Sequence, residues 1–223
     1  MILGKTAVTG AAWAPPTPGC AARRALDILV SAVALLCLLP AMLLIALAIC
    51  MEDEFPIIFC QMRMGKDGRP FRLYKFRKFG RREGTHGLPL TLRDDPRLTV
   101  VGRFLERTKL DELPQFWNVL AGDMSLVGPR PESLNFSDCF QGAYRQVLDH
   151  RPGIFGPAQA KYRNEAALYT AASPERTYRE VLFPAKASLD LAYYPTRTVL
   201  RDVGWIARGL LAVVRGSSRD ALH

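Results

Sequence analysis

One stretch of sequence constrains this chain more than any other, because residues 28–51 carry no charged side chain. A helix needs ~20 predominantly apolar residues to cross the hydrocarbon core of a bilayer, and this stretch is long enough. A cleaved signal peptide fits less well, since its apolar region is only ~7–15 residues long. The stretch therefore predicts a helix inserted in a membrane.

Pro40 lies near the middle of this stretch. A proline inside a helix lacks an amide donor and clashes with the preceding turn, so we expect a kink or a break. Arg23 and Arg24 precede the stretch, Arg63 and Lys66 follow it, and positive residues tend to stay on the cytoplasmic side. The pattern predicts a re-entrant helix with both ends in the cytoplasm. A kinked spanning helix is the alternative, because spanning helices tolerate proline.

The chain as a whole is basic. Lys and Arg total 30 against 21 Asp and Glu, which gives a net charge of +9. This charge suits lipid head groups, phosphorylated substrates or nucleic acid, and does not by itself choose among them. The five cysteines form no CxxC pair and the three histidines are scattered. Neither a disulfide framework nor a histidine-rich metal site is indicated.

The sequence divides into three segments. Residues 1–22 are rich in Ala, Gly, Thr and Pro without periodicity, and they predict a disordered tail. Residues 23–51 form the predicted re-entrant helix. Residues 52–223 are long enough for one ordinary domain, which we expect on the cytoplasmic side.

The pattern within residues 52–223 predicts an α+β fold that is mainly helical. Residues 57–63 and 71–78 are short β-prone runs. The glycines and proline of residues 65–70 lie between them and are typical of a β-hairpin turn.

Residues 98–120 carry helical spacing, which Pro114 interrupts. We expect the helix to stop near Lys109. It would restart with Asp111 and Glu112 in a first turn, where carboxylates suit the helix dipole.

The last apolar segment follows Pro195. At about 100° per residue, its arginines fall on one narrow stripe: Arg197, Arg201, Arg208 and Arg215. Apolar residues gather opposite: Val199, Val203, Ile206, Leu210, Val213 and Val214. This predicts an amphipathic helix lying in the membrane interface. A surface helix packed on a soluble core is the alternative.

Asp111 and Glu112 are the candidate chemical groups. Alone they would be weak evidence, because acidic pairs commonly cap the first turn of a helix. They stand, however, between a basic stretch of residues 97–109 and a Gly/Pro-rich loop at residues 126–131. Carboxylates among cations can hold Mg²⁺ or attack phosphorus while the cations neutralise phosphate charge. The GxxxxGK[ST] phosphate loop is absent, so an ATP-driven machine of that class is not indicated.

An ordered series of motifs runs from Arg23 to Arg215. It comprises residues 24–27 (RALD), 61–65 (QMRMG), 75–77 (KFR), 95–99 (DPRLT), 101–105 (VGRFL), 110–115 (LDELPQ), 117–120 (WNVL), 122–125 (GDMS) and 127–132 (VGPRPE). With these motifs the sequence resembles the monotopic polyprenyl-phosphate sugar-1-phosphate transferases, also called bacterial sugar transferases.

The resemblance implies a helix broken at Pro40 and an active site on the cytoplasmic face of the bacterial inner membrane, in contact with phospholipid. It implies transfer of a sugar-1-phosphate from a UDP-sugar to undecaprenyl phosphate, which releases UMP and initiates glycan assembly. Asp111 would attack the β-phosphorus, Glu112 would assist as a base or metal partner, and Asp111 would hold part of a Mg²⁺ site.

Substrate contacts are expected from cations and polar groups in or near the matched motifs: Lys75, Arg77, Arg107, Asn118, Asp123 and Arg130. Structural salt bridges are the alternative for the cations. Turn capping is the alternative for Asp123 after Gly122.

The chain departs from the family at three places. Leu39 replaces the serine that many relatives carry before Pro40, Glu106 stands where a basic residue is common, and Phe155 replaces a threonine. The resemblance does not transfer the choice of sugar, and a homodimer stays open. An inactive membrane-tethered scaffold on the same fold is a second candidate function, and charge alone would also suit a nucleic-acid-binding protein. The resemblance itself implies no nucleic-acid partner.

Overall fold

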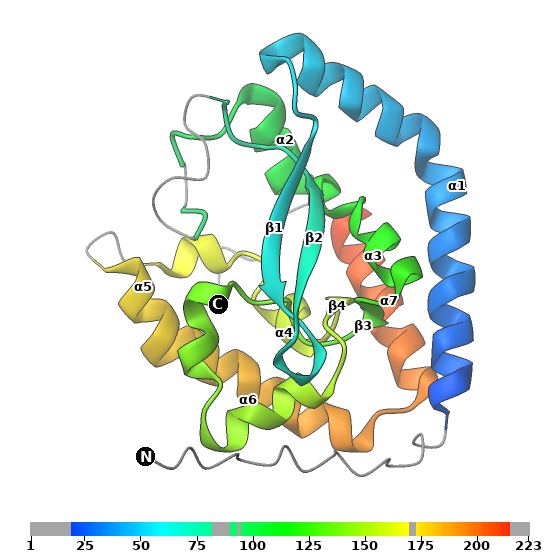
Figure 1. Cartoon of the computed structure of the whole chain (residues 1–223), viewed down its shortest axis with the longest axis vertical. Helices are drawn as coiled ribbons and strands as arrows, with labels where there is room; N and C mark the ends of the chain where they lie inside the picture. The colour runs from blue at the N-terminus through cyan, green and yellow to red at the C-terminus, as the bar shows by residue number, and fades with distance from the viewer. Residues whose placement is uncertain (1–18, 82–89, 93–94, 170–172, 215–223) are drawn as a thin grey trace, which may run out of the picture.

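The computed structural model describes residues 19–81, 90–92, 95–169 and 173–214. The long helix α1 (Cys20–Asp53) runs along one side, and the remaining elements pack into a domain beside it (Figure 1). That domain combines helices with short strands, so the predicted α+β class is confirmed. Of the disordered tail predicted over residues 1–22, residues 1–18 lie outside the described residues. The prediction is wrong over residues 20–22, because α1 already begins at Cys20.

The first sheet is the predicted hairpin. Strands β1 (Ile58–Met64) and β2 (Pro70–Phe76) pair antiparallel, with Cys60 opposite Tyr74. A turn with Asp67 and Gly68 at positive φ joins them, and glycine adopts this conformation without steric cost. A short parallel pair, β3 (Ser125–Val127) and β4 (Gly153–Phe155), lies elsewhere in the domain.

The helical prediction for residues 98–120 is confirmed in its main outline. Helix α2 (Val100–Thr108) ends where Lys109 takes a left-handed conformation. A single 3-10 turn (Leu110–Glu112) follows, and α3 (Gln115–Ala121) begins only after Pro114. Asp111 and Glu112 thus belong to a separate turn and not to the first turn of α3, because Pro114 sets the start of the new helix.

The other described elements complete the domain. They are the 3-10 segments Leu134–Cys139, Gly142–Asp149, Glu165–Leu168 and Tyr194–Thr196, the helices α4 (Pro157–Lys161), α5 (Pro174–Thr177), α6 (Phe183–Tyr193) and α7 (Val199–Val214), and the π-helical turn Tyr178–Leu182.

Helix α1 is bent but not interrupted. The helix continues through Pro40, while Figure 1 shows it changing direction near its middle. The kink that the sequence predicts is therefore present without a break into two half-helices. Among the described residues, α1 is the helix that is long and apolar enough to cross a membrane.

One face of α1 packs against the domain along most of its length. Leu26, Val30, Ala34, Leu35 and Leu38 contact the core beneath β2 and α3, and Met42, Ile45, Ala46 and Ile49 contact the core around Phe76 and Leu105. The opposite face leaves large apolar side chains exposed, among them Leu36, Leu43, Leu44 and Leu47.

Side chains fasten both ends of α1 to the same domain. Near its start, Arg24 donates to the carbonyls of Val119 (2.6 Å) and Leu120 (2.9 Å). At its end, Arg77 donates to the carboxylate of Asp53 (3.0 Å) and to the carbonyl of Glu54 (2.9 Å). These bonds satisfy carbonyls that helix ends leave without intrahelical partners.

Helix α7 only partly matches the predicted basic stripe. Arg197 lies before the helix and turns inward to buried Asp202 (2.8 Å), whereas Arg201 and Arg208 are exposed. Arg215 lies outside the described residues. The stripe prediction is wrong at Arg197, because helical spacing did not anticipate that the helix begins only at Val199.

Candidate active site

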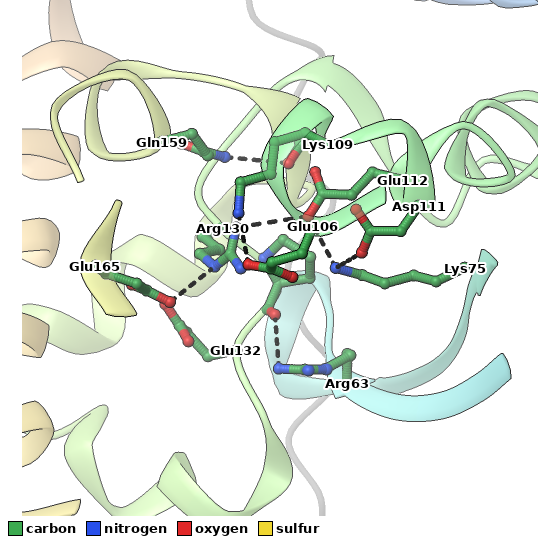
Figure 2. A network of polar contacts seen from close by, with 12 residues as sticks. Arg63, Lys75, Glu106, Lys109, Asp111, Glu112, Arg130, Glu132, Gln159 and Glu165 are labelled. Atoms are coloured by element: carbon green, nitrogen blue, oxygen red, sulfur yellow. Dashed lines mark hydrogen bonds and ion pairs between the residues drawn. The ribbon is translucent and has the colours of Figure 1, made fainter. Parts of the chain in front are cut away.

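Four predicted site residues come together from distant parts of the chain. Asp111 and Glu112 lie on the 3-10 turn between α2 and α3, Lys75 on β2, and Arg130 in the loop after β3 (Figure 2). All four line one cavity of about 1440 Å³. Exposed Arg107 lines it as well, so the cavity is rich in cations.

Asp111 is the most unusual carboxylate of the site. Its side chain is 2% exposed, and its Oδ1 atom has no hydrogen-bond partner among the described residues. The Lys75 ammonium lies 3.9 Å from Oδ2. Burial raises the pKa of Asp111 and outweighs the opposing charges of Lys75 and Lys78. A poorly solvated carboxylate with one unpaired oxygen is suited to attack phosphorus or to bind a cation.

The pKa of Glu112 is shifted in the opposite direction from that of its neighbour Asp111. Lys75 donates to its Oε1 atom at 2.8 Å, and an Arg130 guanidinium nitrogen lies 3.9 Å from the same atom. Burial opposes ionisation, but these two cations outweigh it and hold the pKa of Glu112 at about 2. Glu112 is therefore an anion throughout the neutral range. Figure 2 shows Lys75 pointing to both carboxylates.

Lys75 is held between the two carboxylates by a balance of effects. Burial lowers the pKa of Lys75, and the charges of Glu112 and Asp111 oppose that shift. Lys75 can reach both carboxylates because β2 runs beside the 3-10 turn. The alternate residues Phe71 and Leu73 of the same strand are buried and hold β2 against the core. A lysine here can neutralise charge on a transferred phosphoryl group.

Glu106 organises two further cations at the cavity. It forms ion pairs with Lys78 and with Lys109, the latter at 2.9 Å. Burial opposes ionisation of Glu106, but Lys78 and Lys109 outweigh it and lower its pKa. The glutamate at this position therefore holds two lysines at the cavity, and its own charge offsets one of them.

Arg130 continues into a network that the motifs did not reveal. Its Nε atom lies 3.8 Å from Glu165, and Glu165 accepts from Lys186 at 3.1 Å. Lys186 also pairs with Glu132 at 2.8 Å. Burial opposes ionisation of Glu165, but Lys186 and Arg130 outweigh it and hold its pKa at about 2. Opposite charges thus fix Arg130 from two sides, toward Glu112 and toward Glu165.

Three predicted substrate contacts lie elsewhere or have structural partners. Asn118 is fully buried, accepts from the amide of Tyr74 (3.1 Å) and donates to the carbonyl of Arg72 (2.7 Å). Exposed Asp123 lies 3.5 Å from the Asn118 amide. Neither lines the cavity. Arg77 does line it, but its guanidinium donates to the end of α1.

A divalent cation fits this donor set only with oxygens from a substrate. The described residues contain no cluster of three or more His, Cys, Asp or Glu side chains able to hold a metal. The unpaired Oδ1 atom of Asp111 is one vacant carboxylate oxygen. Mg²⁺ commonly binds one or two carboxylates, substrate phosphates and water, so Asp111 with a bound diphosphate meets that requirement.

Buried Asp111 and half-buried Glu112, set among cations at one cavity, suit phosphoryl transfer, which needs positioning and charge neutralisation. The chain matches the profile of the bacterial sugar transferase family over residues 19–216. It belongs to that family.

Curated relatives agree with the family. The chain is 44% identical over 142 residues to the UDP-N-acetylgalactosamine-undecaprenyl-phosphate N-acetylgalactosaminephosphotransferase of Aeromonas hydrophila, a match that covers 61% of this chain and 33% of the relative. It is 42% identical over 144 residues to the UDP-glucose:undecaprenyl-phosphate glucose-1-phosphate transferase of Escherichia coli strain K12, covering 61% of this chain and 30% of the relative.

A shorter relative is matched over more of its length. The exopolysaccharide production protein PSS of Rhizobium leguminosarum is 40% identical over 147 residues, covering 62% of this chain and 73% of the relative. Against the first two relatives, the chain spans about a third of their length.

Proposed function

We propose that this chain transfers a sugar-1-phosphate from a UDP-sugar to undecaprenyl phosphate, and that the reaction initiates assembly of a polysaccharide. The names of the relatives support both substrates, and that of the Rhizobium protein supports the pathway class. The observation that carries the proposal is the unpaired Oδ1 atom of buried Asp111, at a cavity with Lys75 and Arg130.

In the first step, Asp111 attacks the β-phosphorus of the UDP-sugar. An oxygen–phosphorus bond forms to the carboxylate while the bond between the β-phosphorus and the bridging oxygen breaks, and UMP leaves with that electron pair. Lys75 and Arg130 neutralise charge on the transferred phosphoryl oxygens. An unpaired carboxylate oxygen favours attack, because no hydrogen bond must be broken first.

In the second step, the phosphate of undecaprenyl phosphate attacks the phosphorus bound to Asp111. The bond from phosphorus to the Asp111 oxygen breaks, the carboxylate is regenerated, and undecaprenyl-diphosphate-sugar is released. Glu112 stays ionised next to Lys75. It holds that ammonium beside the reacting phosphorus through both steps. With a pKa of about 2, Glu112 is too weak a base to take a proton from the acceptor phosphate, so positioning is its role in this proposal.

Mg²⁺ would be held by Asp111 together with donor phosphate oxygens, and it would supply charge neutralisation of the diphosphate. Asp111, Lys75 and Arg130 supply the positioning described above.

We place the chain on the cytoplasmic face of the inner membrane with α1 as a re-entrant, monotopic anchor. The bend at the middle of α1 and its two fastened ends support this placement. One domain holds the start of the helix through Arg24 and the end through Arg77, so both ends belong on the same side. A spanning helix would have to leave the packing partners of Leu35 and Ile45.

Release of UMP from a panel of UDP-sugars, with the purified chain and undecaprenyl phosphate, tests the proposal. We expect release with at least one UDP-sugar, together with a lipid-linked sugar product that depends on the acceptor. No release with any sugar, from a folded and membrane-bound chain, would favour the inactive scaffold instead.

A further inference from the structure

The cavity that contains Asp111 has a second wall of different chemistry. Residues of α1, β4 and α7 form it, and they are apolar or small apart from one arginine: Leu38, Ile154, Phe155, Arg208, Gly209, Leu210 and Ala212. A diphosphate and a sugar need charged and hydroxyl-binding groups, which the Asp111 side of the cavity supplies. The apolar wall suits a ligand that carries hydrocarbon as well as phosphate.

Helices α1 and α7 are both fastened to strand β3. In α1, Asp27 accepts from the Ser125 hydroxyl (3.1 Å) and the Leu126 amide (2.9 Å). Before α7, Arg197 donates to the Val127 carbonyl (2.9 Å). The two helices are therefore fastened to consecutive residues of β3.

The side chains near this wall continue onto the exposed apolar surface of both helices. Leu38 of α1 and Ile206 of α7 pack into one cluster with Ile154. On the outside, Leu39 is 48% exposed and Leu210 is 52% exposed. An apolar chain leaving the cavity here would meet exposed leucines of both helices.

We propose that this wall is where the isoprenoid chain of the acceptor enters the cavity, with Arg208 attracting the acceptor phosphate. The inference rests on the proposed function, because it places the second substrate of that reaction in the same cavity. It commits to one ligand class, a phosphate that bears a long unsaturated hydrocarbon chain.

Charge at the entry matches such a ligand. The Arg208 guanidinium lies 4.7 Å from the centre of the Trp205 ring, and within the part of the chain that is described no carboxylate forms a salt bridge with it. It lines the cavity beside the apolar residues Leu210 and Ala212. A phosphate with a hydrocarbon tail would satisfy the cation and the apolar wall together.

Gly209 shapes this entry. A Cβ atom on Gly209 would overlap Cδ1 of Phe155 and lie 2.6 Å from its Cε1, whereas a Cβ on Gly204 of the same helix meets nothing within 4 Å. The Phe155 ring thus rests against α7 only because residue 209 has no side chain. Alanine there would force the Phe155 ring, which lines the cavity, to move.

The matched pair Gly209→Ala and Gly204→Ala tests the inference. Alanine raises helix propensity at either position, but only at residue 209 does it meet Phe155. The unfolding midpoint of both variants is therefore measured together with binding, and binding is compared per folded molecule. The readout is equilibrium binding of radiolabelled undecaprenyl phosphate to the full chain in detergent micelles. We expect Gly209→Ala to weaken binding at least ~10-fold relative to Gly204→Ala. Equal dissociation constants would overturn the inference.

A second change tests whether the displaced Phe155 ring is what weakens binding. Phe155→Ala added to Gly209→Ala removes the displaced ring and should restore binding to within about 3-fold of Gly204→Ala. If the double variant binds undecaprenyl phosphate as weakly as Gly209→Ala, the proposed entry of the isoprenoid chain at this wall is contradicted. Arg208→Gln should weaken binding, while Arg201→Gln should not, because Arg201 binds the Thr196 carbonyl and does not line the cavity.

The first step can be measured without an acceptor. When that step runs forward and back, labelled UMP is incorporated into the UDP-sugar. We expect Gly209→Ala to keep this exchange and the KM for UDP-sugar while raising the KM for undecaprenyl phosphate. Equal losses for both substrates would overturn the inference. A third outcome would contradict the proposed function alone. In it, the wild-type chain binds undecaprenyl phosphate and Gly209→Ala binds it more weakly than Gly204→Ala, but the wild type catalyses no exchange.

Discussion

Two buried aspartates, one in helix α1 and one at the cavity of the candidate active site, show how differently this fold uses the same side chain. Asp27 in α1 is 5% exposed and accepts from the Ser125 hydroxyl and the Leu126 amide. Asp111 is 2% exposed, and its Oδ1 atom has no hydrogen-bond partner among the described residues. The first carboxylate is satisfied by β3 and holds a helix in place. The second keeps an oxygen available at a cavity.

The contrast teaches that burial alone does not distinguish a structural carboxylate from a reactive one. A buried polar group without its partner costs free energy, so an unpaired oxygen persists where the surrounding fold is stable enough to hold it. Asp111 is held by its turn, which Leu110 and Leu113 anchor in the core around Leu105. We therefore expect changes at Asp111 to affect chemistry and changes at Asp27 to affect stability.

The largest expected effect is on turnover at Asp111. Asp111→Asn should reduce sugar-1-phosphate transfer by at least ~1,000-fold, because an amide cannot act as the attacking carboxylate. Its thermal unfolding should stay close to that of the wild type. Near-normal turnover by the purified variant would contradict the role of Asp111.

Metal removal should affect the site around Asp111 and leave the contacts of Asp27 unchanged. EDTA should abolish transfer and Mg²⁺ should restore it, because Asp111 and a bound diphosphate together supply the oxygens that Mg²⁺ prefers. The unfolding midpoint should not change on EDTA treatment, since Asp27 and its partners need no ion. Full transfer in metal-free buffer would remove the cation from the mechanism.

At the other aspartate the effect should be on folding. Asp27→Ala leaves the Leu126 amide without its acceptor, and losing a hydrogen bond to a charged group costs about 2 kcal/mol. Denaturant unfolding in detergent should show this loss, while turnover per folded molecule stays within about 3-fold of the wild type. A folded Asp27→Ala chain as inactive as Asp111→Asn would break the comparison.

A third buried aspartate tests the same distinction between structural and reactive carboxylates, and its expected effect, on the pH dependence of stability, is smaller. Asp190 in α6 also has an oxygen without a partner among the described residues, but it does not line the cavity. Burial raises its pKa to about 7, against the opposing charge of Lys186, while an unfolded aspartate titrates near about 3.9. A raised folded-state pKa means that stability is fully present below the unfolded pKa and is lost as pH rises through the folded one.

The measurement compares unfolding midpoints of the wild type and Asp190→Asn from about pH 5 to about pH 8.5. The wild type should lose stability relative to the variant as the pH rises. His150, whose pKa burial lowers, titrates in both proteins, so the difference isolates Asp190. Parallel curves would show that Asp190 is ionised at no cost.

The sequence predicted the parts of this molecule that depend on local pattern. Turn residues between two β-prone runs predicted the hairpin, and the proline near the middle of an uncharged stretch predicted the bend in α1. The ordered motifs predicted that Asp111, Glu112, Lys75 and Arg130 share a site. The cavity lining confirms that these four lie together, while their chemical roles remain predictions.

Other parts needed the tertiary structure. Glu165, at the start of a 3-10 segment, meets Lys186 of α6 only in the folded chain, and no spacing in the sequence indicates that Lys186 would be buried. Asn118 stands in a matched motif, but its amide spans between α3 and β2 instead of reaching the cavity. A motif shows that a residue matters without showing whether its bonds go to substrate or to backbone.

The central claim is that Asp111 carries the phosphosugar between the two steps. Incubating the chain with a UDP-sugar and no acceptor, followed by acid quench, proteolysis and mass spectrometry, tests it directly. We predict a peptide containing Asp111 that gains the mass of one sugar phosphate, absent in Asp111→Asn and lost when undecaprenyl phosphate is added. Stoichiometric release of UMP with the adduct on another residue, or adduct formation by the Asp111→Asn chain, would contradict the claim.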